Sequence, residues 1–337
     1  MKIMITGGAG FIGSNLAKEL AEEGHEVIVI DDFSYGSMLN LDNNGESRVE
    51  IHNISICDEK ILEIMKGVDY VYHFAAISCL PICLSQPAYT TNVNVAGTLN
   101  ILEAARLNNI KRVIFASSSA VYENNEKFPL KEEDDVNPFS IYGVQKYSGE
   151  LFCKAYRKLY GMDIVILRFF NVYGPNQDYT RQKPPVMSSF IRELIKGKGP
   201  IIYGTGEQKR DFIFIGDVTA LNKKLIEKES AKNETFNVGS GKTYSVNEIY
   251  TAIERILKTG IKPLRREASE LYEGIKNIET GMSIKKEMIA KENNKFTEAD
   301  TSKAKRLLGW EPKMDLEKGI IASIEFIRNM IKMNRNF

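Results

Sequence analysis

A glycine-rich turn near the start of the chain constrains its fold more than any other feature. The segment TGGAGFIG at residues 6–13 follows an apolar, β-branched run and precedes a stretch with helical periodicity. Gly7, Gly10 and Gly13 permit a tight turn, let backbone amides approach a pyrophosphate, and allow the helix to pack closely on the strand. The amino terminus of the helix adds partial positive charge. The segment therefore predicts a strand–turn–helix unit that binds a dinucleotide.

Two carboxylates support this interpretation. Asp31 and Asp32 stand at the end of the next apolar run, roughly 20 residues after the turn, where a carboxylate hydrogen-bonds the adenosine ribose. A carboxylate would repel a 2′-phosphate, and no Arg stands immediately beside it, so NAD is favoured over NADP. The alternative is that the glycines only form a turn and bind no ligand. It is weaker because the strand, the glycine turn, the helix and the carboxylates follow one another in the order typical of a dinucleotide-binding unit.

Strand and helix patterns alternate through the first half of the chain. They predict an α/β fold, a Rossmann-like doubly wound parallel sheet with strand order 3-2-1-4-5-6. The predicted strands are residues 2–6, 26–30, 49–53, 70–74, 112–116 and 163–167, and the main helices are residues 11–23, 95–108 and 142–160.

The pattern changes after Gly174 into a mixture punctuated by Pro and Gly, which predicts a smaller C-terminal mixed α/β substrate lobe. We expect an NAD-binding Rossmann domain over residues 1–175, with return segments from about 210–245, and a mainly substrate-binding lobe over residues 176–337.

Charge and cysteine content exclude several classes of partner. The chain has 45 Lys and Arg against 44 Asp and Glu, so no global field attracts nucleic acid or an anionic membrane. No apolar run approaches membrane-spanning length, and the N-terminus lacks a signal-peptide core. The four cysteines lack paired CxxC spacing and are interpreted as reduced thiols, so we expect a cytoplasmic protein without a metal site.

A catalytic group is predicted from a serine cluster and a Tyr–Lys pair. Ser118 lies at the end of the fifth predicted strand, and Tyr142 and Lys146 lie four residues apart on a predicted helix, which puts them on one face. A nearby cation stabilises a phenolate, so we expect Lys146 to lower the pKa of Tyr142 and make it a general base near neutral pH. We expect Ser118 to hydrogen-bond the same substrate oxygen.

Two other pairs share this spacing, Tyr179/Lys183 and Tyr272/Lys276. Neither has a strand-end serine cluster upstream, so we interpret both as surface coincidences. Position, and not spacing alone, selects Tyr142.

Together these segments resemble the extended short-chain dehydrogenase/reductase family, in its NAD-dependent nucleotide-sugar epimerase/dehydratase branch, with UDP-glucose 4-epimerase-like enzymes nearest. The resemblance covers residues 1–255 and 299–320. Its matching stretches are TGGAGFIG at 6–13, HFAA at 73–76, NVAGT at 94–98, SSSAVY at 117–122, YGVQK at 142–146, RFFNVYGP at 168–175, YGTGEQKRDFIFIGDV at 203–218, FNVGSG at 236–241 and LLGWEP at 307–312.

The resemblance implies a set of NAD contacts. Within it Asn53 and Ile54 touch the adenine, and Asn94 lies near the nicotinamide end. Asn53 replaces the commoner Asp, but its amide oxygen still accepts a hydrogen bond. The implied cofactor-binding residues are Gly7, Gly10, Phe11, Ile12, Gly13, Asp31, Asp32, Phe33, Ser34, Gly36, Asn53, Ile54, Phe74, Ala75, Ala76, Asn94, Tyr142, Lys146 and Phe170.

The resemblance also implies substrate contacts beyond Ser118 and Tyr142. Asn171 would contact the diphosphate or the sugar, Tyr203 the nucleotide base, and Arg210 the diphosphate. A guanidinium suits the last role because its planar fork binds phosphate oxygens and stays charged. The competing interpretation makes Tyr203 an ordinary core residue and Arg210 one half of a surface ion pair with its neighbour Asp211.

The chain departs from the family in residues 262–298. The family's Arg-x-Gly-Asp segment is missing, and an ungapped register puts residues 290–293 in its place. The composition predicts a solvated insertion of charged helix or loop. The same register puts Thr297 where related epimerases gate the 2-substituent of the sugar. Candidate replacements for the lost diphosphate contact are Lys291, Lys295, Arg265 and Arg266.

The implied activity is NAD-dependent epimerisation at C4 of a UDP-sugar, either UDP-glucose/UDP-galactose or an N-acetyl or uronate analogue, through a 4-keto intermediate. A nucleotide-sugar dehydratase or reductase is the alternative, but dehydratases and decarboxylases of the family carry carboxylates just after the serine, where this chain has Ser119 and Ala120. A non-catalytic NAD- or nucleotide-sensing protein is less favoured because such proteins commonly lose the Tyr or Lys. The helices at 95–108 and 142–160 match those that pair in family homodimers.

Overall fold

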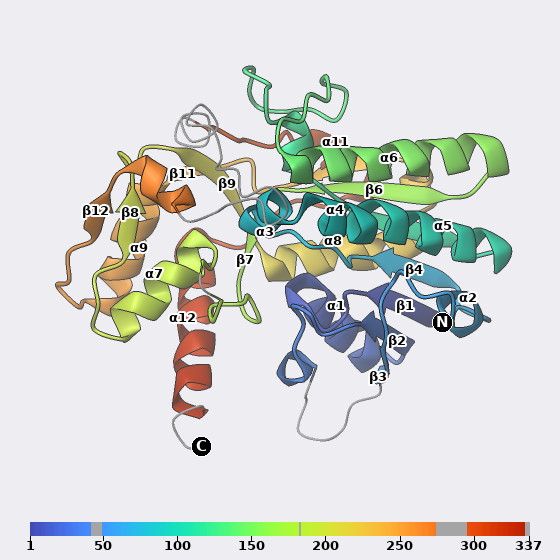
Figure 1. Cartoon of the computed structure of the whole chain (residues 1–337), viewed down its shortest axis with the longest axis horizontal. Coiled ribbons are helices and arrows are strands. Elements are labelled where there is room, and N and C mark those ends of the chain that lie inside the picture. Colours follow the sequence, from blue (N-terminus) through green and yellow to red (C-terminus); the bar gives the residue numbers. More distant parts are fainter. Residues whose placement is uncertain (42–48, 182, 274–294, 334–337) are drawn as a thin grey trace.

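The computed structural model describes residues 1–41, 49–181, 183–273 and 295–333. Two lobes lie side by side (Figure 1). The larger contains a seven-stranded sheet between two layers of helices, and the smaller contains short strands and three long helices. None of the helices within the described residues is long and apolar enough to cross a membrane.

All seven strands of the large sheet run parallel, in the order β10-β6-β5-β4-β1-β2-β3. The predicted order of the first six strands is confirmed. The seventh, β10, was not predicted as a strand and pairs with β6, where Phe236 lies opposite Leu167. The strands are β1 (Lys2–Thr6), β2 (Glu26–Asp31), β3 (Val49–Asn53), β4 (Tyr70–His73), β5 (Arg112–Ser118), β6 (Ile164–Phe169) and β10 (Thr235–Val238).

Helices cover both faces of this sheet. Side chains alternate along a strand, so Ile3 and Ile5 pack in one core cluster and Met4 packs in the other. The first cluster lies under α1 (Phe11–Glu22), α8 (Ile215–Glu227) and α11 (Ser302–Leu308), and the second under α2 (Ile61–Ile64), α5 (Gly97–Leu107) and α6 (Ile141–Tyr160). Burial on both faces explains why inner strands such as β1 and β2 are continuous apolar runs, whereas the edge strand β3 is partly polar and only half-buried.

Short helical segments connect these elements. They are η1 (Met38–Asn40), α3 (Leu80–Ser85), α4 (Pro87–Thr91), η2 (Asn92–Ala96), η3 (Ser119–Tyr122), η4 (Glu229–Ala231) and η5 (Ala268–Tyr272). Of these, η2 is a π-helical turn that runs directly into α5.

The smaller lobe has its own core. Phe190, Ile253 and Ile324 meet in it from three helices. Its elements are β7 (Asn171–Tyr173), β9 (Lys209–Phe214) and β11 (Thr243–Ser245) in one sheet, β8 (Ile201–Tyr203) and β12 (Leu264–Arg266) in another, and α7 (Val186–Ile195), α9 (Val246–Leu257) and α12 (Leu316–Met333).

The divergent stretch differs in part from the prediction. Its beginning forms β12, which pairs with β8, and at its end Thr297 is buried. The prediction of a solvated helix or loop for 262–298 is therefore wrong in part: residues 264–266 form a strand, although they are exposed as predicted, and Thr297 is buried. Residues 274–294, which include Lys276, Lys291 and the 290–293 segment, lie outside the described residues.

Candidate active site

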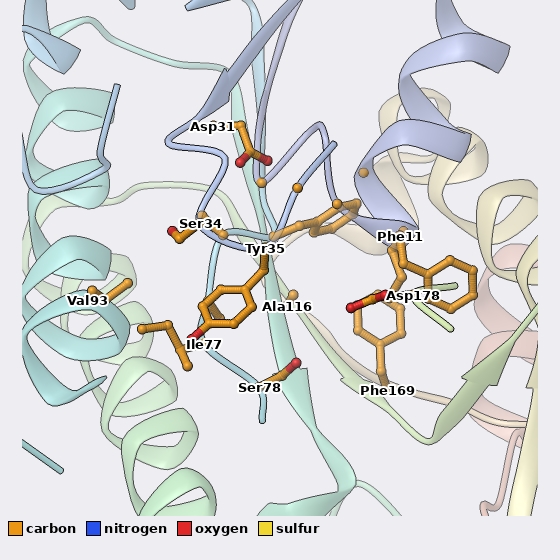
Figure 2. Close-up of a pocket in the computed structure, with 18 of the residues that line it drawn as sticks. Phe11, Asp31, Ser34, Tyr35, Ile77, Ser78, Val93, Ala116, Phe169 and Asp178 are labelled. Carbon is orange, nitrogen blue, oxygen red and sulfur yellow. The ribbon is translucent and has the colours of Figure 1, made fainter. Parts of the chain in front are cut away.

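A cavity of ≈ 360 Å³ opens where the carboxyl ends of β1, β2, β4 and β5 meet the β7–α7 connection. This volume lies in the usual range for small-molecule sites. Figure 2 shows Phe11 and Asp178 on one side of it, Ile77 and Val93 on the other, and Tyr35 between them. The predicted site residues that line it are Gly7, Gly10, Phe11, Ile12, Gly13, Asp31, Asp32, Ser34, Gly36, Ile54, Phe74, Ala75, Ala76, Ser118, Tyr142, Lys146 and Phe170.

The glycine turn fits an anionic ligand for steric and electrostatic reasons. Gly7 has a φ of +69°, and a Cβ there would lie 2.7 Å from the Ala75 nitrogen. A Cβ on Gly13 would lie 2.3 Å from the Gly7 oxygen. Helix α1 starts after Gly10 with no side-chain cap and no acidic residue in its first turn, among the residues described. Its first amides therefore face the cavity without an anionic partner, as a pyrophosphate site requires.

Asp31 organises the loop that closes this end of the cavity. Its Oδ2 accepts from the Ala9 amide at 2.9 Å, and its Oδ1 accepts from the Phe33 amide at 2.9 Å. Burial raises the pKa of Asp31, and the backbone hydrogen bonds oppose that rise. Each carboxylate oxygen retains a second lone pair for a ribose hydroxyl. Gly36 lies against the same carboxylate, since a Cβ there would be 2.7 Å from Oδ1.

The three predicted catalytic residues meet on one wall. Ser118 ends β5, and its Oγ accepts from the Ala120 amide at 3.1 Å. Tyr142 lies in the first turn of α6, and Lys146 lies one turn later. The Lys146 Nζ donates to the Ala116 carbonyl at 2.7 Å and lies 5.9 Å from the centroid of the Tyr142 ring.

Burial dominates the ionisation of this group. It raises the pKa of Tyr142, while the hydrogen bond from Ser118 lowers it; the nearby Cys83 raises it as well. Burial lowers the pKa of Lys146 to about 8. The expectation that Lys146 lowers the Tyr142 pKa is therefore wrong for the protein alone. The Lys146 ammonium lies 5.9 Å from the ring centroid and donates to a carbonyl, and desolvation is the dominant influence on the phenol.

A buried ion pair, missed in the sequence, anchors the catalytic helix. The Glu150 carboxylate accepts from Arg168 Nε at 2.9 Å and Nη2 at 2.8 Å, and from Ser117 Oγ at 2.6 Å. The Glu150 and Arg168 side chains are 0% and 2% exposed. Because Ser117 precedes Ser118, this contact fixes the end of β5 against α6.

A second network explains the place of Asn94. His73 Nδ1 lies 2.7 Å from Thr6 Oγ1, and its Nε2 lies 2.9 Å from Thr98 Oγ1. Burial lowers the His73 pKa to about 3, so the ring is neutral. Thr98 donates to the Asn94 carbonyl, and the Asn94 amide binds both the N–H and the C=O of Ile77. Asn94 thus supports the cavity wall through Ile77 and is not among its lining residues.

Of the predicted substrate residues, Ser118 and Tyr142 line this cavity, whereas Asn171, Tyr203 and Arg210 lie on the smaller lobe and are not among its lining residues. Asn171 is in β7, and its Nδ2 donates to the Asp211 carbonyl at 3.1 Å. Arg210 is in β9 and donates to the Lys295 carbonyl. Tyr203 is in β8, opposite Arg266 of β12.

Besides Asn94, two more predicted cofactor residues, Asn53 and Phe33, lie outside the lining. Asn53 is exposed at the end of β3, opposite Asp31. Phe33 has a φ of +57° and packs against the core beneath the loop.

Two of the four proposed replacement cations have partners on the surface. Arg265 donates to the Thr205 carbonyl at 2.7 Å, and Arg266 forms an ion pair with Glu270 at 2.8 Å.

A third candidate cation, Lys295, is mostly buried, and its Nζ lies 3.5 Å from Glu123 Oε1. Thr297 Oγ1 accepts from the Asp211 amide at 3.3 Å.

Several lining residues were not anticipated. Tyr35 projects across the cavity toward Ile77 and Ser78 in Figure 2. Among the described lining residues Arg181 and Lys146 are the two cations. Tyr35 was within reach of sequence reasoning, because both of its neighbours were predicted to bind the cofactor. Arg181 carried no such signal. The remaining unanticipated residues include Tyr89, Val93, Gln177, Asp178 and Pro185.

Comparisons with known proteins agree with this geometry. A model described as the NAD dependent epimerase/dehydratase family matches residues 3–239. A putative UDP-glucose 4-epimerase of Methanocaldococcus jannaschii is 36% identical over 97% of this chain and 98% of its own. The structure of Thermotoga maritima UDP-glucose 4-epimerase with UDP-glucose superposes with a TM-score of 0.86 at 32% identity, covering 98% of this chain and 100% of that one. Bacillus cereus UDP-glucuronic acid 4-epimerase, in complex with UDP-glucuronic acid and NAD, gives a TM-score of 0.82 at 29% identity, with 98% and 100% covered.

Proposed function

This chain belongs to the NAD dependent epimerase/dehydratase family, and from that premise we propose that it epimerises C4 of a UDP-sugar through a 4-keto intermediate. The observation that carries the proposal is the meeting of Ser118, Tyr142 and Lys146 on one wall of the cavity that starts at the glycine turn.

The residues present fit NAD. The α1 amides and Arg181 would face its pyrophosphate, and Asp31 its adenosine ribose. When bound, NAD would supply the hydride chemistry at C4, and the positive charge of its oxidised ring would favour ionisation of a nearby phenol.

The protein's own groups move the proton. Tyr142 takes the proton of the 4-hydroxyl, and Ser118 hydrogen-bonds the same oxygen. The burial that raises the Tyr142 pKa suits the return step, because a phenol is ready to protonate the oxygen when the ketone is reduced. Lys146, which donates to the Ala116 carbonyl, supports the phenolate during the oxidised half of the cycle.

The smaller lobe would bind the nucleotide. Asn171 and Arg210 suit the diphosphate, and Tyr203 suits the base. Anchoring on the diphosphate side leaves the keto sugar able to turn between the two hydride transfers, which 4-epimerisation requires.

The residues after Ser118 favour epimerisation over elimination or decarboxylation. Ser119 and Ala120 begin η3, and Ala120 is buried. Neither side chain can act as the acid or base that a dehydratase or decarboxylase needs.

Assembly as a homodimer is part of the proposal. The outer face of α6 exposes Val144, Leu151 and Leu159 by 49%, 50% and 70%. This apolar stripe suits a two-fold contact with the same helix of a second copy. All four cysteines are free thiols, which fits a reducing, cytoplasmic location.

Proton NMR of the anomeric signals tests the activity. The purified protein, without added cofactor, is incubated separately with UDP-galactose, UDP-N-acetylgalactosamine and UDP-galacturonate. Conversion of one of them to its 4-epimer is the expected result, and it identifies the 2- and 6-substituents that are accepted. Failure with all three, even after NAD is added, rejects the assignment.

A further inference from the structure

Glu123 fixes the start of the catalytic helix. It follows η3 in the chain, and its side chain is only 5% exposed. Its Oε2 accepts from the amides of Phe139 at 2.9 Å and Ser140 at 2.6 Å, and its Oε1 accepts from Ser140 Oγ at 2.8 Å. Ser140 is the N-cap of α6 and accepts from the Gly143 amide at 3.0 Å. One carboxylate therefore orders the residues that lead into the Tyr142 turn.

The same carboxylate packs against the helix itself. A Cβ on Gly143 would lie 2.7 Å from the Ala120 oxygen and 3.0 Å from Glu123 Oε2. The first turn of α6 thus lies directly on the segment that follows β5. Ala120 also donates its amide to Ser118 Oγ. Glu123 therefore lies where the segments that carry Ser118 and Tyr142 are pressed together.

Lys295 is the counter-ion of this carboxylate. Its Nζ lies 3.5 Å from Glu123 Oε1, and its side chain is 17% exposed. Its carbonyl accepts a hydrogen bond from Arg210. A single residue from the divergent stretch thus contacts both the loop beneath the catalytic helix and the proposed diphosphate-binding arginine.

The segment that begins with Lys295 is firmly seated. The Thr297 amide donates to the Lys209 carbonyl at 3.2 Å, and the Leu130 amide donates to the Glu298 carbonyl at 2.8 Å. Phe296 packs edge-on against Phe128, with ring centroids 4.6 Å apart. The segment consequently bridges β9 of the smaller lobe and the loop after Glu123.

We propose that Glu123 and Lys295 are positioning residues for the epimerisation, a pair that sets Tyr142 against Ser118 and couples the catalytic helix to Arg210. This role rests on the proposed function. It also gives Lys295 a role other than direct replacement of the missing arginine, because its ammonium contacts Glu123 and its carbonyl contacts Arg210.

The charges of the pair make the proposal testable. The titratable groups that face Tyr142 are Cys83 from α3, Lys146 from α6 and Glu123 from the loop, and the Ser118 hydroxyl faces it from β5. The Glu123 charge raises the pKa of Tyr142, and the Lys295 ammonium offsets that charge. Removing Glu123's charge should therefore lower the Tyr142 pKa, and removing Lys295's charge should raise it.

The experiment compares Glu123→Gln, Lys295→Met, Lys295→Arg and the double variant Glu123→Gln/Lys295→Met with the unaltered protein. Glu123→Gln keeps an oxygen for the Phe139 and Ser140 amides. Lys66→Met is the matched control, since Lys66 pairs with Glu63 on the open surface. The readouts are kcat and KM against pH, thermal melting, and the Tyr142 titration of the NAD-bound protein. That titration uses ultraviolet difference absorbance against Tyr142→Phe counterparts, which needs no sugar.

The expected result is a loss of kcat of about tenfold or more in both single variants, with the Tyr142 titration moved down in Glu123→Gln and up in Lys295→Met. Lys295→Arg restores the profile, the double variant is no worse than the poorer single variant, and Lys66→Met changes nothing. The proposal is overturned if the Tyr142 pKa is unchanged in Glu123→Gln and Lys295→Met, or if it shifts in the same direction in both. A protein that binds NAD but converts no UDP-sugar rejects the proposed function instead, and the titration still decides the role of the pair.

Discussion

The surroundings of Tyr142, and not only its spacing from Lys146, determine how readily its phenol ionises. Tyr142 is half-buried in the cavity wall beside Ser118, and desolvation there raises the pKa of its phenol. Another tyrosine with the same Tyr-x-x-x-Lys spacing, Tyr179, packs in the core of the smaller lobe instead. The same four-residue spacing therefore occurs in one place with a serine-lined cavity and in another without it.

Replacing Tyr142 by Phe should lower kcat by about 10²- to 10⁴-fold, because a positioned acid–base group contributes that much. NAD binding should persist, since the ring remains as a wall of the cavity. The measurement is the epimerisation rate by NMR together with the ratio of absorbance at 260 and 280 nm. Tyr179→Phe is the matched control and should retain the rate; equal losses in the two variants would contradict the assignment.

Arg181 is the residue that we expect to contact the cofactor pyrophosphate. It is one of two cations among the described lining residues, and the other, Lys146, lies at the catalytic end. Arg181→Met should weaken binding of ADP-ribose by about tenfold, and more strongly at low salt, because a charge-assisted contact to the pyrophosphate is lost. Isothermal calorimetry with ADP-ribose and with UDP distinguishes the two diphosphates. A loss confined to UDP would assign Arg181 to the sugar nucleotide instead.

At the scale of elements, α6 depends on one buried ion pair. Arg168 of β6 reaches Glu150 of α6 through two hydrogen bonds, and Ser117 of β5 shares the same carboxylate. Three elements of the large lobe meet at this carboxylate, one residue away from Ser118.

Arg168→Met should destabilise the protein by about 3–5 kcal/mol, because it removes the nearer cation from the buried Glu150 carboxylate and leaves it with Lys154 at 3.8 Å. Chemical denaturation measures the loss. Arg255→Met is the control, since Arg255 pairs with Glu317 on the surface and should change stability little. The double variant Glu150→Gln/Arg168→Met should recover part of the loss. If it is as unstable as Arg168→Met, the Glu150 charge is not the cause.

Local patterns predicted most of the large lobe. Apolar runs such as residues 2–6 became strands within a residue or two at each end, because a doubly covered parallel strand needs apolar side chains on both faces. The short strand β10 was not predicted, because it joins the sheet only through long-range pairing with β6.

Contacts between segments far apart in the chain could not be predicted from the sequence. Lys295 meets Glu123 across more than half of the chain, and no local period or spacing links the two residues. The ionisation of Tyr142 was also misjudged, because the four-residue spacing to Lys146 sets a shared face but says nothing of desolvation or of the carbonyl that takes the ammonium.

At the scale of the whole molecule, the two lobes divide the proposed work. The large lobe presents the glycine turn and the catalytic wall, and the smaller lobe presents Asn171, Tyr203 and Arg210 on its strands. Gln177 and Arg181 lie in the connection between β7 and α7 and line the cavity. On the proposed function, a substrate that spans both lobes would be held at its nucleotide end by the smaller lobe while its sugar reaches Tyr142.

The outer surface of the large lobe has an exposed apolar stripe along α6. Val144, Leu151 and Leu159 lie about two turns apart along α6, so they form one exposed apolar stripe. Small or partly covered residues, Ser148 and Ala155, lie between them and permit close approach of a second helix. A two-fold contact would remove this stripe from water on both copies at once.

Leu151→Glu should convert a dimer of the unaltered protein into monomers, because it puts a charge at the centre of an apolar contact that the two-fold axis repeats. The dimer dissociation constant should rise by tenfold or more, which corresponds to about 1.4 kcal/mol. Sedimentation velocity at micromolar concentration measures it. Ile321→Glu is the control, since Ile321 is 41% exposed on α12, away from the stripe, and should leave assembly unchanged. An unaltered protein that sediments only as a monomer removes the dimer from the proposal, whereas a dimer that survives Leu151→Glu moves the contact to another face.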